Sequence, residues 1–424
     1  MPELHTKQLE DARTMAGRRA GCLWYEPGLG KTPTGIGIAK LRDAAGAWSI
    51  VTVRDAIPNW ERELATWAPG KKNISLTHYE ALRKPEVRDQ IAGGRVILFD
   101  EPHVAREIDT EFFRNSYAVT LPAPGARQKS VYLLDGSPVY NGVKDLAAPL
   151  ILAGVYDLNQ YNSFLWRYTD PQPGNFDSYF DYSEPRNLGE LAHQLRQVGI
   201  HRTYADMGVY LPPLYPARID AVLSDDDAGK EYRAAAPDFA AWYRRTRGQQ
   251  LPPLAQFTTQ RRMLSLAKVP TAAARVRYHA GAGGGVLCFT AFRESAERLH
   301  KQFPGSSLVL GGQGAGERAE IFSNLGPGTN KGLVFATMDA LAAALNLQSL
   351  NRFVYVDKPW TPAAIDQTLK RGWRQKQSSA VNVDFIELPN DPIEEHGRKV
   401  LLKKTDLLIK LGLAPTGNLR QISF

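Results

Sequence analysis

The sequence predicts an α/β protein with two doubly wound, mostly parallel sheets and helices on both faces of each. The first observation is a series of short apolar runs, bounded by turn residues and separated by helical stretches. Apolar runs of this length are typical of strands that are buried on both faces of a parallel sheet. The second observation is that such a series occurs before residue 215 and again after residue 270. Alternating strands and helices favour right-handed crossovers, which place helices on both faces.

The predicted elements follow this alternation. A helix is expected over residues 4–20, because Leu4, Leu9, Ala12 and Met15 can share one face. The strands of the first series are residues 22–25, 48–53, 74–77, 95–99 and 130–134. Those of the second series are residues 286–289, 308–310, 332–336, 353–356 and 381–386.

We divide the chain into three parts on this basis. Residues 1–215 form a first lobe with a small helical and aromatic insertion around 145–210. Its aromatic section is expected to pack its own small core, and the alternative is that these side chains stack on bases. Residues 216–270 form a helical linker, and residues 271–424 form a second lobe with a C-terminal helix.

Composition indicates an ordinary globular protein with a basic excess. Of its 424 residues 43% are hydrophobic and 23% charged, and the formal net charge of +8 favours a polyanionic partner. Both cysteines, Cys22 and Cys288, lie inside apolar runs, which favours buried reduced thiols. No signal peptide is apparent, and the longest apolar run, residues 146–156, is too short to span a bilayer. We therefore expect an intracellular protein without membrane association, in a bacterial cytoplasm or nucleoid, possibly virus-encoded.

Residues 24–38 have the strand, loop and helix order of a phosphate cradle. Gly28 and Gly30 allow the backbone to curl so that several N–H groups face one phosphate chain. Lys31 would place its charge on the β- and γ-phosphates, and Thr32 would offer its hydroxyl group to Mg²⁺. The strict pattern has glycine where Tyr25 stands, so an accidental loop is the alternative interpretation.

Two adjacent carboxylates follow the predicted strand 95–99. Asp100 and Glu101 stand where ligands collect in open α/β sheets, and a desolvated carboxylate pair is costly without a cation. Asp100 can hold the water shell of Mg²⁺, while Glu101 can orient and deprotonate the attacking water. Their alternative interpretation is a solubilising strand end.

Other candidate residues have ordinary alternatives when considered singly. Gln8 could be a solvated helix position, and Ser137 could belong to a β-turn, for which Asp-Gly-Ser-Pro is suitable. Arg371 and Arg374 are spaced one helical turn apart, so both guanidinium groups could reach one site. They could equally form a basic helix face.

The order and spacing of these segments resemble superfamily 2 helicase-type motors, closest to the Swi/Snf-like double-stranded DNA translocases. The similarity extends over roughly residues 4–405. The segments that carry it are, in order, LHTKQ, YEPGLGKT, VRDAIPNWERE, LFDEPH, LLDGSPVYN, HRTYADMGVYLPP and DKPWTPAAIDQTLKRGWRQKQ. LFDEPH is similar to a DEAH box, with Pro102 in place of alanine. The resemblance implies two tandem RecA-like lobes and a minimal motor without accessory chromatin domains.

The resemblance also implies roles for individual residues. Gln8 would contact adenine, and Arg371 and Arg374 would act as arginine fingers, with Gln377 closing the motif. The remaining roles are coupling of the two lobes for His103, Ser137 and Gln367, and nucleic-acid contact for Asn59, Trp60, Thr290 and Thr337.

The sequence departs from the family pattern in three places. Asp135 replaces a threonine in the coupling motif, and Arg54 replaces a proline. Residues 336–347 stand where the family has a glycine-rich motif, with Ala342 to Ala344 in place of glycines. This last departure affects the expected DNA contact and coupling of the second lobe.

The expected function is an ATP- and Mg²⁺-dependent DNA translocase that acts on duplex, forked or branched DNA as a monomer. One alternative is a strand-separating helicase for RNA or single-stranded nucleic acid. A second alternative is a nucleic-acid clamp that binds ATP without hydrolysing it.

Overall fold

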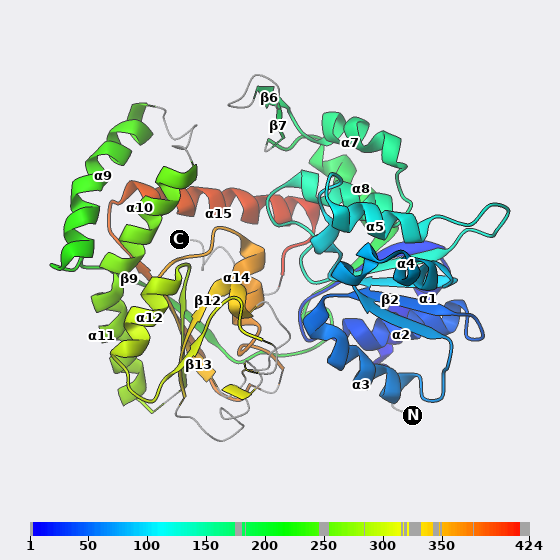
Figure 1. The fold of residues 1–424 in the computed structure, drawn as a ribbon, viewed down its shortest axis with the longest axis horizontal. Coiled ribbons are helices and arrows are strands. Elements are labelled where there is room, and N and C mark those ends of the chain that lie inside the picture. The colour runs from blue at the N-terminus through cyan, green and yellow to red at the C-terminus, as the bar shows by residue number, and fades with distance from the viewer. Residues whose placement is uncertain are drawn as a thin grey trace. The chain divides into compact units, whose positions relative to one another are not determined.

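The computed structural model describes residues 3–173, 180–182, 184–245, 254–283, 285–314, 317, 320–321, 332–341, 347, 350–375 and 377–415. The chain divides into two compact units. Unit 1 consists of Met1–Val209 with Lys404–Gly417, and unit 2 consists of Tyr210–Lys403 with Asn418–Phe424. Each unit is built around one six-stranded sheet (Figure 1).

The sheet of unit 1 is parallel throughout and has the strand order β3-β2-β4-β5-β1-β8. Its strands are β1 (Ala20–Tyr25), β2 (Trp48–Thr52), β3 (Ile74–His78), β4 (Val96–Asp100), β5 (Ser130–Asp135) and β8 (Gly199–Arg202). The carboxyl ends of β1, β4 and β5 are neighbours, because Trp24 pairs with Asp135 and Asp100 pairs with Leu134. This sheet edge is where open α/β sheets bind their ligands.

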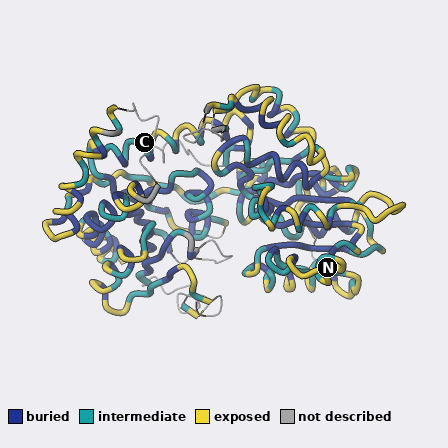
Figure 2. The backbone as a smooth tube through the Cα atoms, turned by 45° about the horizontal axis from the view of Figure 1, so that its top comes forward, coloured by how far each residue is buried: buried dark blue, intermediate teal, exposed yellow. Residues whose placement is uncertain are grey.

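Helices cover both faces of this sheet. Figure 1 shows α2 (Lys31–Arg42) and α3 (Ile57–Trp67) on one side, and α4 (Pro85–Ala92) and α5 (Glu111–Thr120) on the other. Because β4 is covered on both faces, all five of its residues are buried, and the strands lie within the dark interior of Figure 2. The remaining helices of unit 1 are α1 (Thr6–Ala16), α6 (Ala147–Leu152), α7 (Tyr161–Tyr168) and α8 (Leu188–Val198).

The described residues of helix α7, in the aromatic insertion, pack into the main core and not into a separate one. Phe164, Leu165 and Tyr168 of α7 belong to the same buried cluster as Val131 and Leu133 of β5. The expectation of a small core of its own is therefore wrong for these residues. Their aromatic side chains extend the main core on the side of α5 and α6. The short strands β6 (Gln172–Pro173) and β7 (Phe180–Asp181) pair antiparallel beyond this helix.

The sheet of unit 2 is also parallel, with the order β11-β12-β10-β13-β14-β9. Its strands are β9 (Leu214–Asp220), β10 (Gly285–Thr290), β11 (Ser307–Val309), β12 (Leu333–Thr337), β13 (Leu350–Tyr355) and β14 (Val381–Glu387). Alternate residues of β10 enter two different cores: Leu287 and Phe289 join one, and Val286 and Cys288 join the other. Both faces of the sheet are therefore covered.

The helices of unit 2 include two that lie ahead of its central strands. These are α9 (Asp227–Arg245) and α10 (Leu254–Ala267), followed by α11 (Val269–Gly281), α12 (Arg293–Lys301), α14 (Pro362–Leu369) and α15 (Pro392–Leu411). The end of α15 returns to unit 1, where Leu407, Leu408 and Leu411 join the core.

The predicted α/β class with two doubly wound parallel sheets is confirmed. The two units correspond to two tandem RecA-like lobes. Besides the short pair β6 and β7, two strands of the six-stranded sheets were not anticipated. β8 follows directly after α8 and has only one fully buried residue, and β9 is a partly exposed edge strand with a proline. The structure starts unit 2 at Tyr210, whereas the predicted boundaries were at residues 215 and 270.

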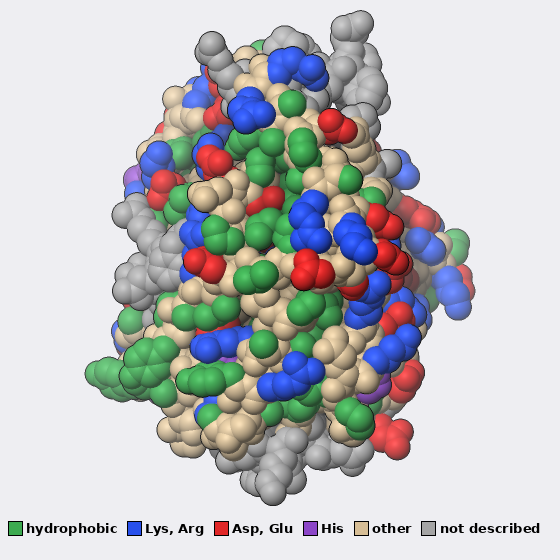
Figure 3. Space-filling view, turned by 90° about the vertical axis from the view of Figure 1, so that its left-hand side faces the viewer, with side chains coloured by type: hydrophobic (Ala, Val, Ile, Leu, Met, Phe, Trp, Pro, Cys, Tyr) green, Lys and Arg blue, Asp and Glu red, His purple; other side chains and the backbone are tan. Residues whose placement is uncertain are grey.

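The surface and the helices give two further findings. Figure 3 shows basic and acidic side chains interspersed on one face, among apolar ones, without a continuous basic surface over the part that is described there. None of the described helices has the length and apolar character needed to cross a membrane.

Candidate active site

The loop between β1 and α2 has the backbone of a phosphate cradle. Gly28 and Gly30 have φ values of 86° and 83°, a conformation that side chains rarely adopt. Gly30 is the N-cap of α2, so the helix begins at Lys31 and its free N–H groups point at the loop. A helix N-terminus behind a glycine loop attracts anions. The residues present therefore fit a nucleotide phosphate chain.

Lys31 lies between this loop and the acidic strand end. Its Nζ is 3.4 Å from the carbonyl oxygen of Tyr25 and 3.9 Å from Oε1 of Glu101. A Cβ added to Gly136 would stand 3.1 Å from the same nitrogen, so the backbone after β5 also approaches it closely. The ammonium group is therefore held at the carboxyl ends of β1, β4 and β5, where a phosphate chain on the loop would meet it.

Asp100 is buried, and both hydrogen bonds that its side chain accepts from described residues go to one carboxylate oxygen. Oδ2 accepts hydrogen bonds of 2.8 Å from the hydroxyl group of Thr52 and from the indole N–H of Trp60. The side chain of Asp100 takes no other hydrogen bond from the described residues, so Oδ1 remains for a cation or its water. Burial raises the pKa of Asp100, although the hydrogen bond from Trp60 and the charge of Lys31 act to lower it. A carboxylate in this setting fits a hydrated Mg²⁺.

Glu101 has an unusual backbone. It is in the left-handed region, with φ 53° and ψ 52°, and it is followed by the short helix η3 (Pro102–Ala105). Strained non-glycine residues of this kind cost about 1–3 kcal/mol and cluster at functional sites. The bend turns the Glu101 carboxylate toward Lys31 and His103. Burial raises the pKa of Glu101, and Lys31 counteracts it.

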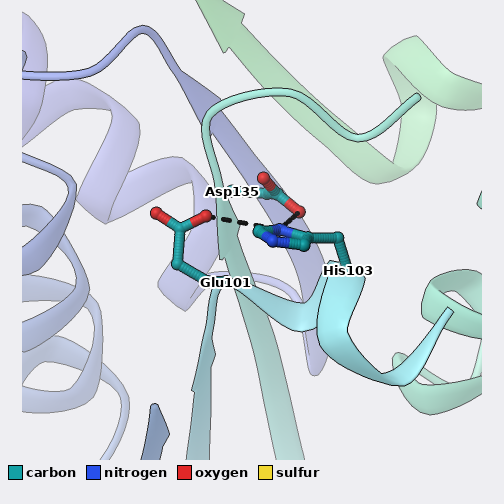
Figure 4. A group of neighbouring side chains, drawn as sticks. All are labelled: Glu101, His103 and Asp135. Carbon is teal, nitrogen blue, oxygen red and sulfur yellow. Dashed lines mark ion pairs between the residues drawn. The ribbon is translucent and has the colours of Figure 1, made fainter. Parts of the chain in front are cut away.

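His103 links Glu101 to Asp135 (Figure 4). Nδ1 of His103 lies 3.4 Å from Oε2 of Glu101 and 3.4 Å from Oδ2 of Asp135. Its ring packs at 4.7 Å from the ring of Tyr140. Burial disfavours the charged imidazole, but the Asp135 carboxylate outweighs burial and raises the pKa of His103. The three side chains could also hold a metal ion, because one ligand atom of each lies within 4.8 Å of the others.

The residue Asp135, which departs from the family pattern, is thus an acceptor at the centre of the site. It is 1% exposed, and Oδ1 accepts a hydrogen bond of 3.0 Å from the backbone N–H of Ser137. The predicted coupling residues His103 and Ser137 are therefore brought together, both on Asp135.

Gln8 lies beside the loop, as an adenine contact would require. Its Nε2 donates to the carbonyl oxygen of Leu29 at 2.9 Å, and its Oε1 accepts from the N–H of His5 at 2.9 Å. The helix α1 therefore presents Gln8 to the same loop that carries Gly30 and Lys31. Its assignment to adenine stays a prediction.

The predicted nucleic-acid contacts of unit 1 differ in accessibility. Asn59 is partly exposed and its Oδ1 accepts from Arg62 at 2.9 Å. Trp60 is 0% exposed, and its indole N–H is used by Asp100. The structure thus places Trp60 behind the acidic strand end instead of on a surface. Sequence reasoning missed this role and that of Thr52, although Thr52 ends a buried strand beside the acidic one.

In unit 2 the two arginines do not lie on a helix. The helix α14 ends at Leu369, and the N–H groups of Gly372 and Trp373 both bond to the carbonyl oxygen of Leu369. Arg371 and Arg374 are therefore in a turn, which corrects the prediction of helical spacing. Gly372 is closely packed within this turn, since an added Cβ would stand 2.5 Å from Phe353 and 2.7 Å from the oxygen of Leu350.

The other predicted residues of unit 2 lie at the end of this helix and of two strands. Gln367 is on α14, three residues before its C-cap Lys370. Thr290 is 0% exposed and donates to the carbonyl oxygen of Phe292 at 2.8 Å, while Thr337 accepts from the N–H of Gly311 at 3.2 Å. Of the altered motif at 336–347, residues 342–346 lie outside the described part of the chain.

Comparison with known proteins agrees with these features. Residues 268–376 match the family described as "Helicase conserved C-terminal domain". Two Arabidopsis thaliana proteins, the probable ATP-dependent DNA helicases CHR23 and CHR12, are 26% and 27% identical over 242 and 244 residues. Each alignment covers 50% of this chain and 22% of the relative, so the chain spans about a fifth of their length.

The Sulfolobus solfataricus SWI2/SNF2 ATPase core in complex with dsDNA aligns over 91% of this chain and 88% of that chain, with 19% identity and a TM-score of 0.44. The same core domain without DNA aligns over 92% and 86%, with 19% identity and a TM-score of 0.43. Residues 268–376 thus match a helicase C-terminal domain, and half of the chain is similar to proteins named as probable ATP-dependent DNA helicases.

Proposed function

We propose that this protein is an ATP-dependent DNA translocase that couples ATP hydrolysis to movement along duplex, forked or branched DNA. The observation that carries the proposal is the convergence of Lys31, Asp100 and Glu101 at one end of the unit 1 sheet. The cradle of Gly28 and Gly30 stands beside them. The relatives named as ATP-dependent DNA helicases support the choice of DNA.

The hydrolytic step follows from the positions of these groups. The loop N–H groups and Lys31 hold the β- and γ-phosphates, and Thr32 and Oδ1 of Asp100 would hold Mg²⁺. The metal ion supplies charge neutralisation on the phosphate oxygens. Glu101 orients a water molecule and takes its proton as the water oxygen bonds to the γ-phosphorus. The bond from that phosphorus to the β-phosphate oxygen breaks, which yields ADP and phosphate.

The second unit would complete the site. Arg371 and Arg374 would reach the γ-phosphate as arginine fingers, a contribution of about 10³ to 10⁵ in rate in other nucleotide hydrolases. Closure and reopening of the lobes in each cycle would move them along a phosphate backbone. DNA affinity would then depend strongly on salt and little on sequence. We place the protein inside the cell as a monomer, with any recruiting partner left to experiment.

The test is ATP hydrolysis by the purified protein with Mg²⁺ at low salt. The arms are no nucleic acid, blunt duplex DNA, forked DNA, single-stranded DNA and RNA. The proposal requires strong stimulation by duplex or forked DNA. Stimulation by single strands or RNA alone would favour a strand-separating helicase. Tight ATP-dependent binding to nucleic acid without any hydrolysis would favour the clamp.

A further inference from the structure

We propose that Tyr204 is a positioning residue that ties the segment leaving unit 1 to the nucleotide loop, and so transmits nucleotide occupancy to it. The segment is residues 203–209, at whose end the chain passes into unit 2. The inference rests on the proposed function, because it takes the loop to be the ATP site. It adds a route by which nucleotide binding at that site changes the conformation of the segment where unit 1 ends.

The contacts of Tyr204 join it to two consecutive loop residues. Its backbone N–H donates to Oε2 of Glu26 at 2.7 Å, and its hydroxyl group donates to the carbonyl oxygen of Pro27. Tyr204 and Glu26 are 0% and 1% exposed. The N–H of Glu26 in turn donates to the carbonyl oxygen of Arg202 at 3.0 Å, which continues the pairing of β1 with β8.

The neighbouring residue makes a second connection to the same site. Arg202 donates to both oxygens of Asp11, at 2.8 and 2.6 Å, and the hydroxyl group of Tyr25 donates to Asp11 at 2.5 Å. Asp11 lies on α1, one turn after Gln8, which bonds to the loop. Arg202 and Tyr204 therefore hold the helix and the loop on the two sides of the proposed nucleotide site.

Residues 203–209 form a compact turn that is held by hydrogen bonds within the segment. Oδ2 of Asp206 accepts from the N–H of Thr203 at 2.8 Å and from its hydroxyl group at 2.7 Å. The N–H of Met207 bonds to the oxygen of Thr203 at 3.2 Å, and the N–H of Val209 bonds to the oxygen of Tyr204 at 2.9 Å. A shift of Tyr204 is thus carried to the residue at which unit 1 ends.

The close packing of these buried groups couples the nucleotide loop to residues 203–209. Pro27 and Gly28 are adjacent, so a phosphate chain that orders the glycine backbone also fixes the carbonyl group that Tyr204 contacts. Buried, close-packed groups shift together or change partners, because the interior has no space for independent motion. The loop with nucleotide therefore favours one arrangement of residues 203–209, which is the differential contact that linkage requires.

The first experiment uses Tyr204→Phe, which removes the hydroxyl group and leaves the ring and the backbone contact with Glu26. We expect basal ATP hydrolysis within about 2-fold of the wild type, and stimulation by duplex DNA lowered about 5-fold or more. The matched control is Tyr168→Phe, another buried tyrosine of unit 1, whose hydroxyl group donates to Glu190 at 2.8 Å. If both variants keep full stimulation, Tyr204 has only a structural role and the inference fails.

The second experiment does not depend on hydrolysis. Amide hydrogen exchange is followed with and without a non-hydrolysable ATP analogue. In the wild type we expect slower exchange at residues 26–32 and also at 203–209; in Tyr204→Phe, only at 26–32. Protection confined to 26–32 in the wild type would overturn the inference and leave the proposed function standing. An analogue that protects neither segment and does not bind would overturn both.

Discussion

Nζ of Lys31 lies 3.9 Å from Oε1 of Glu101, across the edge between β1 and β4. The two residues are 70 positions apart in sequence, and the parallel pairing of β1 and β4 with β5 brings them together. The cation that would hold the phosphates therefore also acts to lower the pKa of the carboxylate that would accept the proton. The ammonium group of Lys31 would thus take part in both nucleotide binding and the proton transfer to Glu101.

Lys31→Ala and Glu101→Gln should each reduce ATP hydrolysis at least about 100-fold, the size of a general-base contribution. Lys31→Ala should also weaken ATP binding, because it removes the charge at the phosphates. Glu101→Gln should leave ATP binding near the wild-type level, since the amide keeps the shape of the side chain. Steady-state hydrolysis and equilibrium binding of a fluorescent ATP analogue separate the two effects. Full hydrolysis by either variant would refute the site.

Trp60→Phe should lower the affinity for Mg²⁺ and the free energy of unfolding. The indole N–H is one of two donors that fix Oδ2 of Asp100, and loss of a hydrogen bond to a buried charged group costs about 1–3 kcal/mol. The measurements are the Mg²⁺ concentration for half-maximal hydrolysis and urea unfolding. Trp67→Phe, on the same helix, is the control, because its indole group makes no hydrogen bond to any residue that the structure describes. Equal behaviour of the two variants would contradict the role given to Trp60.

The sequence was sufficient to predict those parts of the candidate site that depend on short local motifs. The glycine loop, Lys31 and the carboxylates Asp100 and Glu101 follow from residue type and strand ends, and the structure brings them together. The role of Trp60 could not be anticipated, because an aromatic residue on a helix gives no sign of which strand end it will face. The contact of Tyr204 with Pro27 could not be anticipated either, because β8 is short and only partly buried, and its residues pair with residues of β1 that lie 177 positions earlier, as Gly199 does with Cys22.

Gly372→Ala should destabilise unit 2 by about 1–3 kcal/mol, in the range of overpacked cores. The added methyl group would meet Phe353 and the backbone oxygen of Leu350, and the oxygen cannot rotate away. The turn that carries Arg371 and Arg374 would shift, so hydrolysis should fall as well. Thermal unfolding and hydrolysis are the measurements. Gly281→Ala, where nothing lies within 4 Å of the new Cβ, should be tolerated; an equal loss there would remove the steric explanation.

Asp384→Asn should expose a pH-dependent contribution to stability. Burial acts to raise the pKa of Asp384, but hydrogen bonds from His279 and Arg275 outweigh it and lower the pKa. A carboxylate with a lowered pKa stabilises the fold above its unfolded pKa of about 3.9, and this contribution is lost as the pH falls through the folded value. The stability difference between wild type and variant should therefore be present at neutral pH and shrink as the pH falls below about 4. A difference unchanged by acid would contradict the ion pairs.

Arg374→Ala should cut turnover about 10³-fold or more while ATP affinity changes little, because an arginine finger acts on charge that develops in the transition state. Arg374 suits this role in the structure: no hydrogen bond or ion pair of its guanidinium group to any described residue is seen, and it lies in a turn whose backbone is fixed by Leu369 and Gly372. Single-turnover hydrolysis at saturating ATP measures the chemical step, and binding of the ATP analogue measures affinity. Arg374→Lys, which keeps the charge but loses the planar fork, should recover only a small part of the rate. A loss confined to ATP affinity would assign Arg374 to binding, because a residue that contacts the ground state and the transition state equally changes the affinity and leaves turnover intact.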